Sequence, residues 1–96
     1  MSRPPRWTFT AGEYAADTLQ AILKSGDERL YRATLLFLRG AALEAGSAVA
    51  AGHAPPGLRL DDGRIALEIP REPIVIYYVP DTDRSEMHVT NVIWLS

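Results

Sequence analysis

The chain contains no cysteine. This excludes disulfide bonds and thiolate chemistry, and it agrees with a cytoplasmic location. Histidine is scarce, with only His53 and His88, so a zinc site is not expected. No uninterrupted apolar run reaches the roughly 18 residues of a membrane span, so the sequence predicts no membrane association.

Phosphate-binding glycine motifs are also missing, because neither G-x-x-x-x-G-K-[ST] nor G-x-G-x-x-G occurs. No cofactor is therefore expected. The net charge of −2 and the pI of about 5.6 argue against a protein whose whole surface binds nucleic acid. The length of 96 residues predicts one domain over residues 1–96.

The N-terminal half predicts a strand followed by a helix. Trp7–Thr10 alternates apolar and polar residues, which is typical of a half-buried strand. Thr10 and Glu13 have the spacing of a capping box, so a helix should begin there. An apolar stripe follows at helical spacing: Ala15, Leu19, Ile22 and Leu23.

A second helix is predicted immediately afterwards. Gly26 favours the end of the first helix, and Asp27 is a good N-cap for the next. The second helix should end between Gly46 and Gly52, and the short connection predicts an antiparallel helix hairpin. Its small residues, Gly46 among them, would let another element approach closely.

The C-terminal half predicts strands separated by turns: Leu58–Leu60, Arg64–Ile69, Ile74–Val79 and Met87–Leu95. The Asp62-Gly63 pair predicts a two-residue hairpin loop. Ile74–Val79 is apolar throughout, which is typical of a central strand covered on both faces. Unbroken alternation in Met87–Leu95 would place Met87, Val89, Asn91, Ile93 and Leu95 together, opposite His88, Thr90, Val92 and Trp94.

These elements predict an α+β fold of order β-α-α-β-β-β, in which the brief Leu58–Leu60 strand leads into a three-strand meander. The sheet should be small, twisted and mainly antiparallel, with the helix hairpin on one face.

Arginines are the strongest candidates for a site. Arg59, Arg64 and Arg71 are close together in the sequence, and Arg59 and Arg64 could meet across the tight turn. Such a cluster is suited to binding phosphate or carboxylate. The alternative is that all three are solvated residues at the sheet edge, with Arg64 paired to Asp62 or Glu68.

Proton transfer has two candidates, His88 and Tyr78. The alternatives are a solvated histidine on the last strand and a tyrosine packed in the core, because Tyr77 and Tyr78 must point to opposite faces. The acidic pairs Asp61/Asp62 and Asp81/Asp83 are explained by turn geometry, so no metal site is expected.

Four segments together resemble the RelE/ParE toxin superfamily, and the resemblance covers nearly the whole chain. They are Trp7–Thr10 before a helix, Pro56–Leu60 before a glycine turn, Ile74–Val79, and His88–Ile93. Ribosome-dependent members typically carry an arginine at the start of the third segment, as in an Arg-Leu-Val-Tyr run, where this chain has Ile74-Val75-Ile76-Tyr77 and lacks the arginine.

The resemblance implies the toxin component of a type II toxin–antitoxin system, bound by a cognate antitoxin protein. It implies either metal-independent, ribosome-dependent mRNA cleavage or, in the ParE branch, inhibition of a topoisomerase without catalytic residues. For cleavage, Arg59 and Arg64 would bind RNA phosphate, Arg64 and Arg71 would stabilise the transition state, and His88 or Tyr78 would transfer the proton. The alternative is a non-catalytic interaction module that forms a homodimer through its sheet edge or the small residues of its second helix.

Overall fold

The computed structural model describes residues 6–95, and residues 1–5 and 96 of the predicted domain lie outside this range. It contains five strands and two helices. In chain order they are β1 (Thr8–Ala11), α1 (Glu13–Lys24), α2 (Glu28–Ala50), β2 (Leu58–Arg59), β3 (Ile65–Glu68), β4 (Ile74–Asp81) and β5 (Glu86–Trp94).

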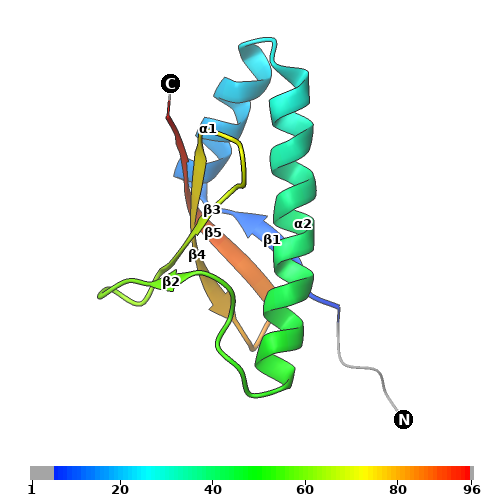
Figure 1. The fold of residues 1–96 in the computed structure, drawn as a ribbon, viewed down its shortest axis with the longest axis vertical. Coiled ribbons are helices and arrows are strands. Elements are labelled where there is room, and N and C mark those ends of the chain that lie inside the picture. The colour runs from blue at the N-terminus through cyan, green and yellow to red at the C-terminus, as the bar shows by residue number, and fades with distance from the viewer. Residues whose placement is uncertain (1–5, 96) are drawn as a thin grey trace.

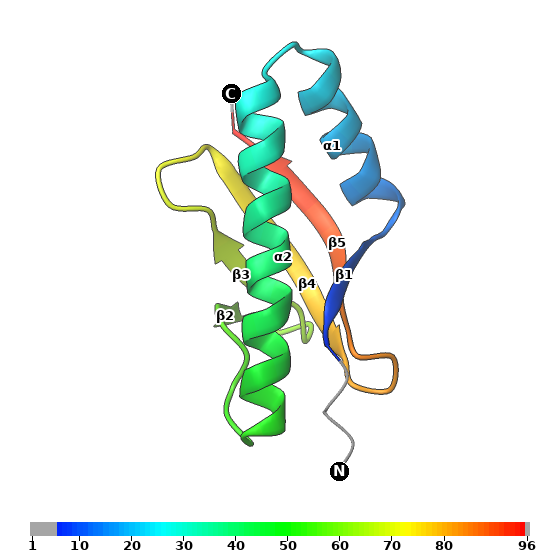
Figure 2. The same cartoon turned by 90° about the vertical axis from the view of Figure 1, so that its right-hand side faces the viewer.

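The strands form one mixed sheet in the order β1-β5-β4-β3-β2. β1 runs parallel to β5, and every other neighbouring pair is antiparallel. Both helices lie on the same side of this sheet, with α2 crossing its middle (Figures 1 and 2). The predicted α+β fold, with a helix pair packed on a mainly antiparallel sheet, is confirmed.

The two helices begin in different ways. The Asp27 carboxylate accepts a hydrogen bond from the Leu30 amide at 3.0 Å, which confirms the N-cap predicted for α2. α1 begins after Gly12 without any side-chain cap. Thr10 belongs to β1 and its hydroxyl bonds to His88, so the predicted capping box is wrong.

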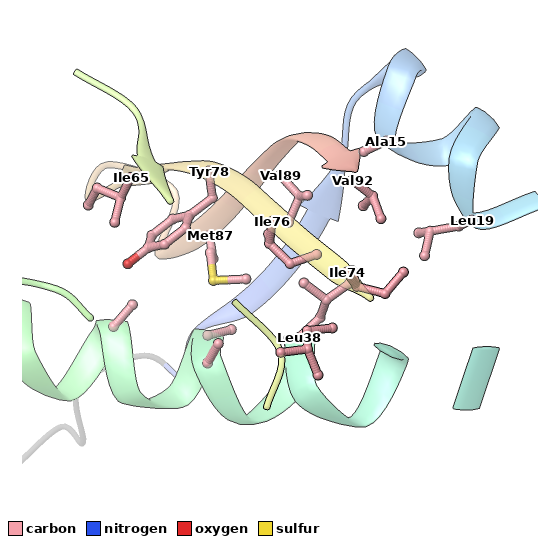
Figure 3. Packing of buried hydrophobic residues seen from close by; sticks show 14 of the residues in the cluster. Ala15, Leu19, Leu38, Ile65, Ile74, Ile76, Tyr78, Met87, Val89 and Val92 are labelled. Carbon is pink, nitrogen blue, oxygen red and sulfur yellow. The ribbon is translucent and has the colours of Figure 1, made fainter. Parts of the chain in front are cut away.

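The core lies between the sheet and the helices. Figure 3 shows Ile76, Tyr78 and Met87 between the strands and α2. α2 has the length and composition of a helix that could cross a membrane. Its apolar stripe, however, is buried in the core: Leu30, Leu38, Ala41, Ala42 and Ala45 are all at most 6% exposed. This is the packing of an amphipathic helix in a globular domain.

β4 is the central strand, as predicted, but the helices cover only one of its faces. Ile74, Ile76 and Tyr78 are buried against the helices. Val75 and Tyr77 point to the other face and are half-buried. The continuous apolar run of β4 therefore supplies a partly apolar outer surface in addition to the core.

A β-bulge interrupts β5. Tyr77 is paired with Asn91 and Tyr78 with Val89, which leaves Thr90 without a partner. The Thr90 hydroxyl donates to the Tyr77 carbonyl at 3.2 Å. The extra residue reverses the alternation after position 90, so Val92 is buried and Asn91 turns outward. The predicted grouping of Asn91 with Met87 and Val89 is therefore wrong.

The loop between β2 and β3 is one residue longer than predicted. The Leu60 amide donates to the Arg64 carbonyl at 2.7 Å, so three residues, 61–63, form the loop. Gly63 has a φ of +90°, whereas neither aspartate has a positive φ. Glycine in the left-handed position is typical of a three-residue hairpin loop with a bulge.

Candidate binding surface on the open sheet face

The side of the sheet that faces away from the helices is called the open face here. No helix of the part of the chain described covers it (Figure 1). Register and burial assign to it the following side chains: Thr10, Leu58, Arg64, Ala66, Glu68, Val75, Tyr77, Val79, His88, Asn91 and Ile93. The surface mixes apolar, aromatic and polar groups. Leu58 and Val79 are 71% and 38% exposed.

Arg64, which immediately precedes β3, lies on this face and is held by three neighbours. Its Nε donates to Asp62 Oδ2 at 2.7 Å, and its Nη1 donates to Asn91 Oδ1 at 2.9 Å. Its guanidinium carbon lies 4.9 Å from the centroid of the Tyr77 ring, a cation–π contact. Because the side chain is only 32% exposed, these contacts fix one orientation of the guanidinium.

Asp62 counters the charge of Arg64. The Arg64 amide donates to Asp62 Oδ1 at 3.0 Å, and this bond and the guanidinium lower the pKa of Asp62. The carboxylate therefore stays ionised at neutral pH. Since one charge faces the other, Arg64 is a weaker ligand for a phosphate than a free arginine would be.

His88 lies on the same face, on β5. Its Nδ1 is 3.0 Å from Thr10 Oγ1, so the hydrogen bond joins β5 to β1 across the parallel pair. Its cross-strand partner on β4 is Val79. The contact with Thr10 orients the imidazole and leaves Nε2 as the nitrogen available to a ligand.

Tyr78 does not lie on the open face. It is fully buried, and its hydroxyl donates to the Pro56 carbonyl at 2.6 Å. Burial, with a smaller contribution from the negative charge of Glu44, raises the pKa of Tyr78 to about 12. The predicted role in proton transfer is therefore not supported, and the tyrosine of the open face is Tyr77.

The three arginines predicted to act together are separated. Arg59 is paired with Ile65, so it belongs to the opposite face from Arg64. Arg71 lies in the turn after β3, at the other end of the strand from Arg64, and has a φ of 67°. The structure brings together Arg64 and, farther along the same face, His88. Within residues 6–95 no three His, Asp or Glu side chains form a group that could hold a metal ion.

No protein-family model, curated protein or solved structure matches this chain. Its functional assignment consequently depends on the geometry of its own residues.

Sequence reasoning missed two residues of the Arg64 cluster, Tyr77 and Asn91. Tyr77 could have been found, because it alternates with Ile76 and Tyr78 and must lie on the outer face if those are buried. Asn91 could not, because simple alternation puts it in the core and only the bulge at Thr90 turns it outward.

Proposed function

We propose that this protein is a RelE/ParE-like toxin component, located in the cytoplasm and bound by a cognate antitoxin protein. Its open face would bind a target protein, with a topoisomerase as the expected class from the ParE-type resemblance. The order of its elements supports the proposal, as does the helix hairpin on one face of a mainly antiparallel sheet.

The cluster of Arg64, Tyr77 and Asn91 is the observation that carries this proposal. Arginine and tyrosine dominate the energetics of protein interfaces, especially where apolar groups surround them. Here Val75, Val79 and neighbouring apolar side chains surround the cluster on the open face. Because Arg64 is already held by Asp62 and Asn91, little side-chain entropy would be lost when a partner binds.

The same geometry favours binding over catalysis. An mRNA-cleaving site needs cations that converge on the phosphate and a group that transfers a proton near neutral pH. Arg59 and Arg71 lie elsewhere, Asp62 counters the charge of Arg64, and the Tyr78 hydroxyl is buried. The open face is therefore better suited to a protein surface than to an RNA phosphate.

Ribosome-dependent mRNA cleavage is the second candidate function. One observation favours it: His88 and Arg64 share the open face, with Val79 of β4 between them. In that case His88 would transfer the proton and Arg64 would contact the phosphate.

The test begins with induction of the protein in a bacterial host. Wild type should arrest growth, whereas Arg64→Ala and Tyr77→Ala should not, since loss of an interface hot spot weakens binding by about 30-fold or more. Arg59→Ala and Arg71→Ala are matched controls that remove a guanidinium off this face and should still arrest growth. Folding of every variant is checked by circular dichroism.

Purified protein then distinguishes the two functions. Binding to a topoisomerase should inhibit DNA supercoiling and leave mRNA on programmed ribosomes intact, and His88→Ala should retain full activity. Mapped mRNA cleavage that is lost in His88→Ala would instead establish the second function. Absence of growth arrest, of topoisomerase inhibition and of cleavage would exclude both.

A further inference from the structure

A groove runs between α2 and β1, on the helix side of the sheet. It consists of two adjoining hollows of about 490 and 350 Å³ that share Arg6, Trp7 and Leu43. Phe9 and Arg39 line one hollow, and Gly46 lines the other. These six residues define the β1–α2 groove, which is distinct from the open face.

The groove is apolar at its base and positively charged at its margin. Trp7 is 8% exposed and packs directly on Gly46. Leu43 is 40% exposed, so it presents an apolar side chain to solvent. Arg6 and Arg39 are the charged residues that line it, and among the residues described no acidic side chain does. An apolar ligand that carries carboxylates matches this pattern.

The adjoining strand has an unpaired edge. Within residues 6–95, β1 is the outermost strand of the sheet and pairs with β5 alone, so the N–H and C=O groups on its other side have no strand partner in that range. Thr8 and Phe9 of this strand also line the groove. An exposed edge beside an apolar groove is suited to β-augmentation, in which an extended peptide adds a strand.

We infer that the β1–α2 groove binds an acidic, apolar segment of a partner protein. The segment pairs with the free edge of β1, packs apolar side chains against Trp7, Phe9 and Leu43, and directs carboxylates to Arg6 and Arg39. This goes beyond the proposed function, because it concerns the opposite side of the sheet and does not depend on what the open face binds.

Charge and the free strand edge favour an acidic peptide segment over a second copy of the chain, nucleic acid or a membrane as the occupant of the groove. A second copy whose own β1–α2 groove faced this one would supply no carboxylate from that groove, because its lining holds Arg6 and Arg39 and no acidic residue. Nucleic acid would satisfy the arginines but would not fill the apolar base of the groove. An anionic membrane offers both negative charge and apolar chains, but unlike a peptide it cannot pair with a strand edge.

The experiment is a selection from a displayed library of random peptides on the purified full-length protein, with Leu43→Glu as the counter-selection target. Enriched peptides should combine apolar residues with Asp or Glu. Their affinities, measured by fluorescence anisotropy, should fall at least about 10-fold for Arg39→Glu and Leu43→Glu and also fall with added salt. Arg59→Glu is the matched charge reversal on the far edge strand and should bind normally, as should Arg64→Ala.

Five results would overturn the inference, four of them from the peptide selection and its binding measurements. These four are no enrichment over bare support, a basic or uncharged consensus, binding that Arg39→Glu leaves unchanged, and displacement of the peptide by RNA or by phosphatidylglycerol vesicles at micromolar concentration. A wild-type homodimer that Leu43→Glu dissociates in sedimentation experiments would also overturn it, because the groove would then hold a second copy. Chemical-shift changes in Thr8–Ala11 on peptide binding would support it directly.

Discussion

Two glycines of α2 should respond differently to the same substitution. Gly40 and Gly46 both lie in the interior of the helix, at Glu28–Ala50. A Cβ built on Gly40 meets nothing within 4 Å, whereas one built on Gly46 lies 2.5 Å from Cγ and Cδ1 of Trp7. Gly40→Ala is therefore expected to stabilise the protein and Gly46→Ala to destabilise it relative to that variant.

The magnitudes follow from two separate contributions. Alanine is favoured over glycine in a helix interior by about 0.8–1.0 kcal/mol, and this gain applies to both positions. Only Gly46→Ala must also displace Trp7, which is buried and fixed between the helix and β1. Such overpacking typically costs about 1–3 kcal/mol, so the two variants should differ by about that amount.

Urea denaturation followed by circular dichroism measures the difference in the free energy of unfolding, and thermal melts measure the corresponding difference in melting temperature. For a domain of this size 1 kcal/mol corresponds to about 4–8 °C, so the melting temperatures should differ by at least about 4 °C. In a Trp7→Leu background, Gly46→Ala should lose its penalty and become stabilising, as a double-mutant cycle would show. Equal free energies of unfolding for the two single variants would refute the contact between Trp7 and α2, and with it the base of the β1–α2 groove.

Three further predictions test the electrostatics and backbone of the same fold. The pKa of Tyr78 is raised from 10.0 to about 12, so the stability from its neutral phenol is complete below pH 10 and is lost as pH rises towards 12. Wild type should therefore lose up to about 1.4 kcal/mol more per pH unit than Tyr78→Phe in this window, as measured by denaturation, and equal slopes would contradict burial. Arg71 has a φ of 67°, a conformation that is strained for arginine and free of strain for glycine. Arg71→Gly should therefore leave the free energy of unfolding unchanged or raise it by up to about 1 kcal/mol in urea titrations. The control Arg59→Gly should lower the free energy of unfolding. Hydrogen bonds from Arg29 lower the pKa of Glu72 in the folded protein. The stabilisation from this pair is therefore complete above the unfolded-state pKa of Glu72 and is lost as pH falls through its lower folded-state pKa, so Glu72→Gln should flatten that acid-side decline in thermal melts.

Much of the fold could be predicted because local patterns and tertiary packing agree. The second helix, its Asp27 cap and the central place of β4 in the sheet each have one consistent interpretation, and each was found in the structure. The capping box failed because Thr10 and Glu13 have the right spacing, yet pairing of β1 with β5 keeps Thr10 in a strand. Tertiary pairing prevailed over a local signal worth about 1 kcal/mol.

The composition of the open face was harder to predict because two offsets of a single residue decide it. A two-residue loop at Asp62-Gly63 would have paired Arg59 with Ala66 and placed it on the open face near Arg64. The observed three-residue loop pairs it with Ile65 and turns it to the other side.

The bulge at Thr90 has the converse effect on β5, since it brings Asn91 out to the guanidinium of Arg64. One offset thus removes a cation from the open face and the other adds a neutral amide that holds the remaining arginine. Both changes make the surface less suited to phosphate and more suited to a protein. The chain also departs from the ribosome-dependent pattern at the start of β4, where Ile74 stands in place of an arginine, and this agrees in direction with these two features of the backbone.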